Sequence, residues 1–147
     1  MRLAVFDTNV VVSAAIKREG APAKLMMDWV LEGQVQLVTS PRIVAEYREV
    51  IRRDKFHRYG FPPLWLEFMI EESLQLSNPD PWPHPSPDPK DGPFLALAHA
   101  SGAWLVTGNL KHFPEAASYG VNMISMEAYK VHLYKVHLTD GGTPPTR

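Results

Sequence analysis

The stretch Leu3-Ala4-Val5-Phe6-Asp7-Thr8-Asn9 decides the fold, because it joins an unbroken apolar run to an abrupt polar end. An apolar run without polar alternation predicts a strand that is buried on both of its faces. Such strands occur in parallel sheets that helices cover on both sides. We therefore expect Asp7 at the carboxyl end of a central strand, where the ligands of parallel sheets collect.

Three further strands are predicted along the chain, at residues 35–38, 103–106 and 121–124. Segments with apolar residues at helical spacing lie between them, including one that Ser40-Pro41 caps and one over residues 63–76 that buries Leu74. Strands that alternate with helices are typical of an α/β fold with a parallel sheet between two helical layers.

The length of 147 residues, with 45% hydrophobic and 21% charged residues, indicates one folded domain. We predict a single domain over residues 1–138 and a frayed tail over 139–147 that is rich in Gly and Pro. The absence of Cys excludes disulfides and thiolate metal sites. No apolar run approaches the roughly 18 residues of a membrane span, so we expect a cytoplasmic protein without a membrane partner.

The charge is nearly balanced, with 15 Lys and Arg against 16 Asp and Glu. Such a chain has no overall field that attracts nucleic acid, so a polyanion must be bound by a local patch. Basic residues gather around Glu46, at Arg42, Arg48, Arg52, Arg53, Lys55 and Arg58. This stretch fits a track for phosphate groups and equally fits a solvated helix face.

Polar segments stand at the ends of the predicted elements and carry the chemistry. They are Asp7-Thr8-Asn9, Glu46, the segment Asp88-Pro-Lys-Asp91 and Thr107-Gly108-Asn109. If the sheet gathers them, three carboxylates and an amide meet in one crevice, where like charges need a cation between them. Oxygen donors without Cys favour Mg²⁺ or Mn²⁺ over Zn²⁺. Phosphodiester hydrolysis is the leading chemistry for such an ion.

Each of these residues also has an ordinary structural role. Asp7 can cap the helix that follows it, although the dipeptide Thr8-Asn9 can provide the same cap. Glu46 fits a solvated carboxylate near the start of a helix. Asp91 is a candidate N-cap, and Asn109 is a candidate turn residue. The prediction of a site therefore depends on the combination of these residues.

Four motifs together resemble those of PIN-domain nucleases, in the branch that contains the toxins of toxin-antitoxin pairs. They are Val5-Phe6-Asp7-Thr8-Asn9-Val10, Glu46, Asp91-Gly-Pro-Phe-Leu-Ala-Leu-Ala98 and Leu105-Val-Thr-Gly-Asn-Leu-Lys-His-Phe113. The likeness extends over residues 2–126. It implies a three-layer α/β/α sandwich with a central, mostly parallel sheet, and a metal-dependent endoribonuclease site.

The resemblance also implies which residues form that site. The catalytic positions are Asp7, Glu46, Asp91 and Asn109, and the first three of these are the ligands of Mg²⁺ or Mn²⁺. The supporting residues are Thr8, Asn9, Thr107 and Asp88, where Asp88 is also an alternative to Asp91 as the third acid. Many members have Asp at the fourth position, so the uncharged Asn109 puts a second metal in doubt.

The substrate implied by the resemblance is single-stranded RNA, for which Arg42, Arg48 and His112 are candidate contacts. The implied protein partner is an antitoxin. We interpret the proline-rich segment 79–89 as a stiff connector. This segment and the tandem Tyr-Lys-Val-His-Leu copies over 129–138 are also candidate surfaces for an inhibitory partner or a homodimer.

Two other functions stay open. A haloacid-dehalogenase-like phosphatase also begins with an apolar strand and an Asp, but its chemistry needs an acid two residues later, where this chain has Asn9. A degenerate PIN module that binds RNA or a protein without cleaving it fits the uncharged Asn109. Metal-dependent turnover of RNA separates the degenerate module from the nuclease.

Overall fold

The computed structural model describes residues 3–16, 30, 32–53, 63–85, 89–108 and 119–139. The strands are β1 (Leu3–Phe6), β2 (Gln36–Thr39), β3 (Leu74–Gln75), β4 (Trp104–Val106) and β5 (Met123–Ile124). The helices are α1 (Thr8–Ile16), α3 (Pro41–Ile51), α5 (Pro63–Glu71), α6 (Gly92–Ser101) and α7 (Met126–Thr139), with a short 3₁₀ turn over Pro89–Asp91. None of these described helices is long and apolar enough to cross a bilayer.

The five strands form one sheet in the order β3-β2-β1-β4-β5, and every neighbouring pair is parallel. β1 lies in the centre, where Ala4 pairs with Leu37 of β2 and with Trp104 of β4. Ala4 and Val5 are completely buried, as the unbroken apolar run predicts. The α/β prediction and the strand over residues 3–6 are therefore confirmed.

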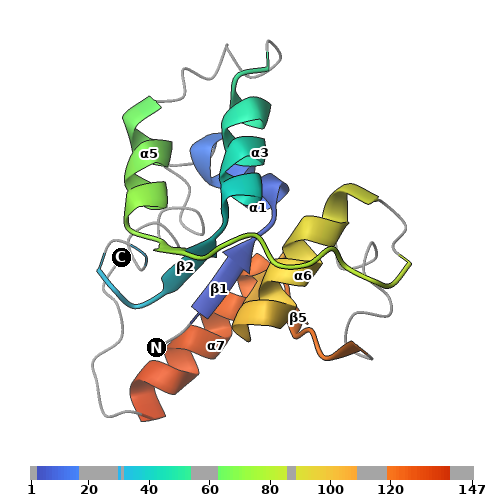
Figure 1. The fold of residues 1–147 in the computed structure, drawn as a ribbon. Helices are drawn as coiled ribbons and strands as arrows, with labels where there is room; N and C mark the ends of the chain where they lie inside the picture. The colour runs from blue at the N-terminus through green and yellow to red at the C-terminus, as the bar shows by residue number, and fades with distance from the viewer. Residues whose placement is uncertain are drawn as a thin grey trace.

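The carboxyl ends of the strands all face the same edge of the sheet, because the strands are parallel. Figure 1 shows α1 and α3 beyond the arrowhead of β1, and α6 running along the sheet. The largest completely buried side chains are Tyr47 of α3 and Tyr129 of α7, which fix these helices on the core. Residues 140–147 of the predicted tail lie outside the described residues, and α7 continues through Thr139.

The predicted helix over residues 63–76 is too long. α5 ends at Glu71, and Leu74 and Gln75 instead form β3, which pairs with Val38 and Thr39 of β2. The cause lies at Ser73, whose hydroxyl donates to the carbonyl of Ile70 at 2.5 Å and contacts the Thr39 hydroxyl at 2.8 Å. Such side-chain bonds compete with helical ones and turn the chain. Leu74 is 40% exposed, so its predicted burial is wrong.

The start of α3 differs from the predicted Ser40 cap, because the Ser40 side chain makes no capping hydrogen bond. The cap comes from a distant residue: the backbone N–H of Arg42 donates to Oδ1 of Asn78 at 3.0 Å. Asn78 thereby ties the proline-rich segment to the first turn of α3, beside the carboxyl end of β2.

We expect Asn78→Ala to lower the free energy of unfolding by about 1 kcal/mol, because the first turn of α3 loses a capping acceptor. Urea unfolding followed by circular dichroism measures the change. Ser77→Ala is the matched control, since Ser77 is exposed and adjacent. Equal stabilities of the two variants would contradict the capping role.

Candidate active site

Asp7 follows β1 directly and is only 7% exposed. Its Oδ1 accepts the backbone N–H of Val10 at 3.0 Å, and its Oδ2 accepts the hydroxyl of Thr107, which follows β4. The backbone N–H of Asp7 also donates to the carbonyl of Val106 on β4 at 3.1 Å. Asp7 is therefore fixed through its main chain as well as through its carboxylate. Asp7 therefore caps α1, and the predicted cap by Thr8-Asn9 is wrong.

Thr8 has a different partner, because its hydroxyl donates to Oε2 of Glu46 on α3. Glu46 is half-buried and lies beyond the first turn of α3, which contains no acidic residue. The interpretation of Glu46 as a solvated carboxylate in the first turn is therefore wrong. Asn9, the other predicted supporting residue in this segment, is exposed.

Tyr47 follows Glu46 on α3 and is a residue of the site that the sequence motifs do not single out. Its hydroxyl is completely buried and donates to the carbonyl of Phe6 at 2.5 Å. Burial raises the pKa of Tyr47 well above its ordinary value, and the negative charges of Asp7 and Glu46 raise it further. A tyrosine on an otherwise apolar helix face is a sequence signal for such a buried polar contact.

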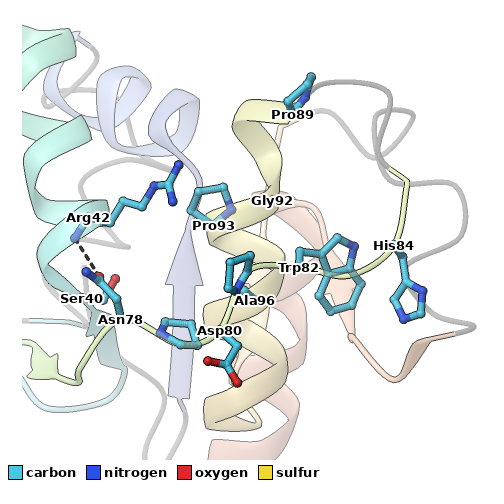
Figure 2. Close-up of a pocket in the computed structure, with 12 residues that line it drawn as sticks. Ser40, Arg42, Asn78, Asp80, Trp82, His84, Pro89, Gly92, Pro93 and Ala96 are labelled. Carbon is cyan, nitrogen blue, oxygen red and sulfur yellow. Dashed lines mark hydrogen bonds between the residues drawn. The ribbon is translucent and has the colours of Figure 1, made fainter.

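Asp91 is the last residue of the 3₁₀ turn and stands directly before α6. Asp91 occupies the predicted N-cap position of α6, but its side chain makes no capping hydrogen bond, and its Oδ2 is shielded from solvent. The first turn of α6 packs on α3, where the rings of Phe94 and Tyr47 lie 6.4 Å apart. α6 contacts β1, and Figure 2 shows Pro93, two residues after Asp91, beside the arrowhead of this strand.

The structure brings Asp7, Glu46 and Thr107 together at the carboxyl edge. Within the described ranges, no group of three or more His, Asp or Glu residues is close enough to hold a metal ion. The donor chemistry nevertheless fits Mg²⁺ or Mn²⁺, since Asp7 and Glu46 offer only oxygen and concentrate negative charge beside Tyr47. The role of Asp91 as a third ligand stays a prediction. The predicted residues Asp88, Asn109 and His112 lie outside the described residues.

Two arginines of the predicted basic track pair with carboxylates, and Lys55 and Arg58 of that track lie outside the described residues. Arg48 binds Glu67 of α5 through two hydrogen bonds, of 3.0 Å and 2.5 Å, and this contact lowers the pKa of Glu67. Arg53 pairs with Glu49 one turn earlier at 2.9 Å. Arg48 thus joins α3 to α5, which argues against its predicted role as an RNA contact. Arg42 forms no ion pair with any described residue.

A central parallel strand that ends in a fixed, buried Asp defines the class of α/β proteins that bind ligands at the carboxyl edge of the sheet. Residues 3–111 match the family model described as PIN domain. The uncharacterised protein MJ1680 of Methanocaldococcus jannaschii is 31% identical over 108 residues, which cover 71% of this chain and 69% of that protein. The chain belongs to the PIN domain family, whose members are generally nucleases.

Solved structures share the fold at low sequence identity. VapBC2 from Rickettsia felis, bound to a DNA fragment from its promoter, matches with a TM-score of 0.58 at 14% identity over 84% of this chain and 98% of that chain. FitAB bound to an IR36 DNA fragment matches with 0.54 at 18% identity, over 84% and 94% of the two chains. PAE2754 from Pyrobaculum aerophilum matches with 0.51 at 14% identity, over 90% and 89%. These matches confirm the three-layer α/β/α sandwich.

We expect Tyr47 to make stability fall at alkaline pH. Above pH 10.0, the ordinary pKa of tyrosine, the unfolded chain loses the Tyr47 proton while the folded chain keeps it. The folded state then binds more protons, so the free energy of unfolding decreases as pH rises. Urea unfolding from pH 8 to about 11 should show that the free energy of unfolding decreases less steeply with pH in Tyr47→Phe than in the wild-type chain. Tyr119→Phe, at a half-buried ring, is the control, and equal slopes in both variants would refute the assignment.

Proposed function

We propose that this chain is a Mg²⁺- or Mn²⁺-dependent endoribonuclease that hydrolyses phosphodiester bonds of single-stranded RNA. The observation that carries the proposal is the buried Asp7 carboxylate, fixed at the end of the central strand by Thr107 and by the N–H of Val10. Membership of the PIN domain family supports a nuclease. Metal dependence and the choice of RNA come from the motif resemblance and the oxygen donor set.

The ligands in this proposal are Asp7, Glu46 and Asp91. When bound, the ion polarises the phosphoryl group, activates the attacking water and stabilises the leaving oxygen. The chain orients these ligands through hydroxyl groups: Thr107 fixes Asp7, and Thr8 occupies Oε2 of Glu46. Oε1 of Glu46 is therefore the atom that would either bind the ion or accept the proton of the attacking water.

We also propose that the chain is the toxin of a toxin-antitoxin pair and acts in the cytoplasm on cellular RNA. The motif resemblance supports this role, and the fold shared with VapBC2 and FitAB is consistent with it. Coexpression with the product of the adjacent reading frame tests the partner. Growth arrest by the chain alone, relieved by that product, would support the pair.

We expect Asp7→Asn and Asp91→Asn to reduce Mn²⁺-stimulated RNA cleavage by more than about a hundredfold, because each removes a ligand charge. The fold should persist in Asp7→Asn, since the new amide still offers an oxygen to the N–H of Val10. Initial rates on a labelled single-stranded RNA, with Mn²⁺ or with EDTA, measure the effect.

On α3, Glu46→Gln should also lose activity. The matched control is Glu49→Gln on the same helix, which changes an exposed carboxylate and should keep full activity. Undiminished cleavage by Asp7→Asn and Asp91→Asn would refute the assigned site. RNA binding by the wild-type chain without turnover in Mn²⁺ would instead favour the degenerate PIN module.

Thr107 offers a separate test, because it acts on Asp7 rather than on the substrate. Thr107→Val removes the hydroxyl that fixes Oδ2 of Asp7, and should lower the affinity for Mn²⁺ or the cleavage rate about 10- to 100-fold. Thr107→Ser keeps the hydroxyl and should restore most of the loss. Titration of the rate against Mn²⁺ gives the affinity, and equal curves for both variants would show that the hydroxyl does not position Asp7.

A further inference from the structure

A groove of about 330 Å³ opens at the start of α6, beside the candidate active site. Gly92 and Pro93, which follow Asp91 directly, form part of its wall. The rest comes from the start of α3 and from residues 78–84 of the proline-rich segment. Figure 2 shows Arg42 and Asn78 on one side of α6, and Trp82 and His84 on the other. The groove therefore includes the two residues that follow the candidate third acid in the chain, and its two ends differ chemically. One carboxylate, that of Asp80, also lines it.

The cationic end of the groove is formed by Arg42. Its side chain is exposed, and no described residue pairs with its guanidinium, in contrast to Arg48 and Arg53 on the same helix. Figure 2 shows the guanidinium reaching from α3 toward Pro93. A guanidinium in this position presents several N–H donors with the geometry that phosphate oxygens require.

The aromatic end of the groove is formed by Trp82 and His84, which are half-buried. The His84 ring stacks on Tyr119 with centroids 3.6 Å apart and 9° between the planes. The Trp82 ring makes edge contacts with the rings of His99 and His84, with centroid distances of 5.8 Å and 5.1 Å. Neighbouring rings hold these two side chains in place, so a ligand that stacks on them loses little entropy in ordering them.

The segment between the two ends is also fixed. It contains alternate prolines, and Asn78 ties it to α3 through the bond to the N–H of Arg42. At its other end Trp82 packs closely on α6, because a Cβ on Gly92 would lie 3.8 Å from Cβ of Trp82. The predicted stiff connector is therefore one wall of a preformed groove.

We propose that this groove binds a short single-stranded segment of the RNA substrate, spanning more than one nucleotide. Arg42 contacts a backbone phosphate, and a base stacks at Trp82 and His84. A cation and fixed aromatic rings along one track are the combination that binds single strands, since every base has an aromatic face. The assignment rests on the proposed RNA cleavage, because Gly92 and Pro93 of the groove wall follow Asp91 directly.

The test measures binding of a 2′-O-methyl RNA strand of about eight nucleotides by fluorescence anisotropy, in Mg²⁺ and in EDTA, beside an abasic strand of equal length. The wild-type chain should bind the intact strand about tenfold more tightly than the abasic strand. His84→Ala should abolish that preference. Arg42→Gln should weaken the binding of both strands by the same factor. It should also reduce the slope of log K against log salt concentration by about 0.7.

Arg53→Gln is the control for Arg42→Gln, because Arg53 lies on the same helix outside the groove and pairs with Glu49. The comparison of two strands on the wild-type chain needs no variant, so it stands even if His84→Ala folds poorly. Equal binding of both strands, or no binding of either in both buffers, overturns the proposal and leaves the groove to a protein segment.

The test also separates the groove from the proposed function. Base-dependent binding that Arg42→Gln weakens, without any cleavage of ordinary RNA in Mn²⁺, supports the groove and refutes the nuclease. Cleavage in Mn²⁺ whose KM is unchanged in both Arg42→Gln and His84→Ala supports the nuclease and refutes the groove.

Discussion

The hydrogen bonds that hold the buried Asp7 carboxylate are the constraint on which the rest of the structure depends. A carboxylate without donors in the interior costs several kcal/mol, of the order of 3 or more. The donors here come from Thr107 after β4 and from Val10 in α1, so satisfying one side chain fixes two further elements relative to β1. The central parallel pair β1 and β4 supplies the geometry, because both strands end at the same edge.

A second layer of contacts joins α3 to the same edge. Thr8 donates to Glu46, and Tyr47 donates to the carbonyl of Phe6, so two consecutive residues of α3 contact the two residues that flank Asp7. The negative charges of Asp7 and Glu46 both raise the pKa of Tyr47. Groups held on rigid elements in this way keep the precision that catalysis requires. The hydroxyl groups thus position the two acids.

The sequence predicts well those elements whose apolar residues form a pattern that reflects burial. The strand over residues 3–6 and the parallel α/β class follow from one apolar run, whereas β3 is short and exposed and its formation depends on a turn at Ser73. For the candidate site, an acid after a buried strand is visible in the pattern. The partners of that acid are not, since Thr107 lies 100 residues from Asp7 and Tyr47 lies 41 from Phe6. Spacing identifies the candidate groups, and only the fold decides which of them meet.

The near-neutral net charge can be explained by where the charged side chains lie and which of them form ion pairs. Arg48 and Arg53 compensate carboxylates on the helix surface, so their charges hold α3 and α5 together and contribute little attraction to a distant polyanion. Arg42 differs from them because it lines the groove at the start of α6 and forms no ion pair with a described residue. A polyanion would then be bound by a few directed contacts rather than by a general field. A chain with a net charge of −1 can therefore act on a polyanion if its basic and acidic groups are sorted in space, as they are around α3 and the end of β1.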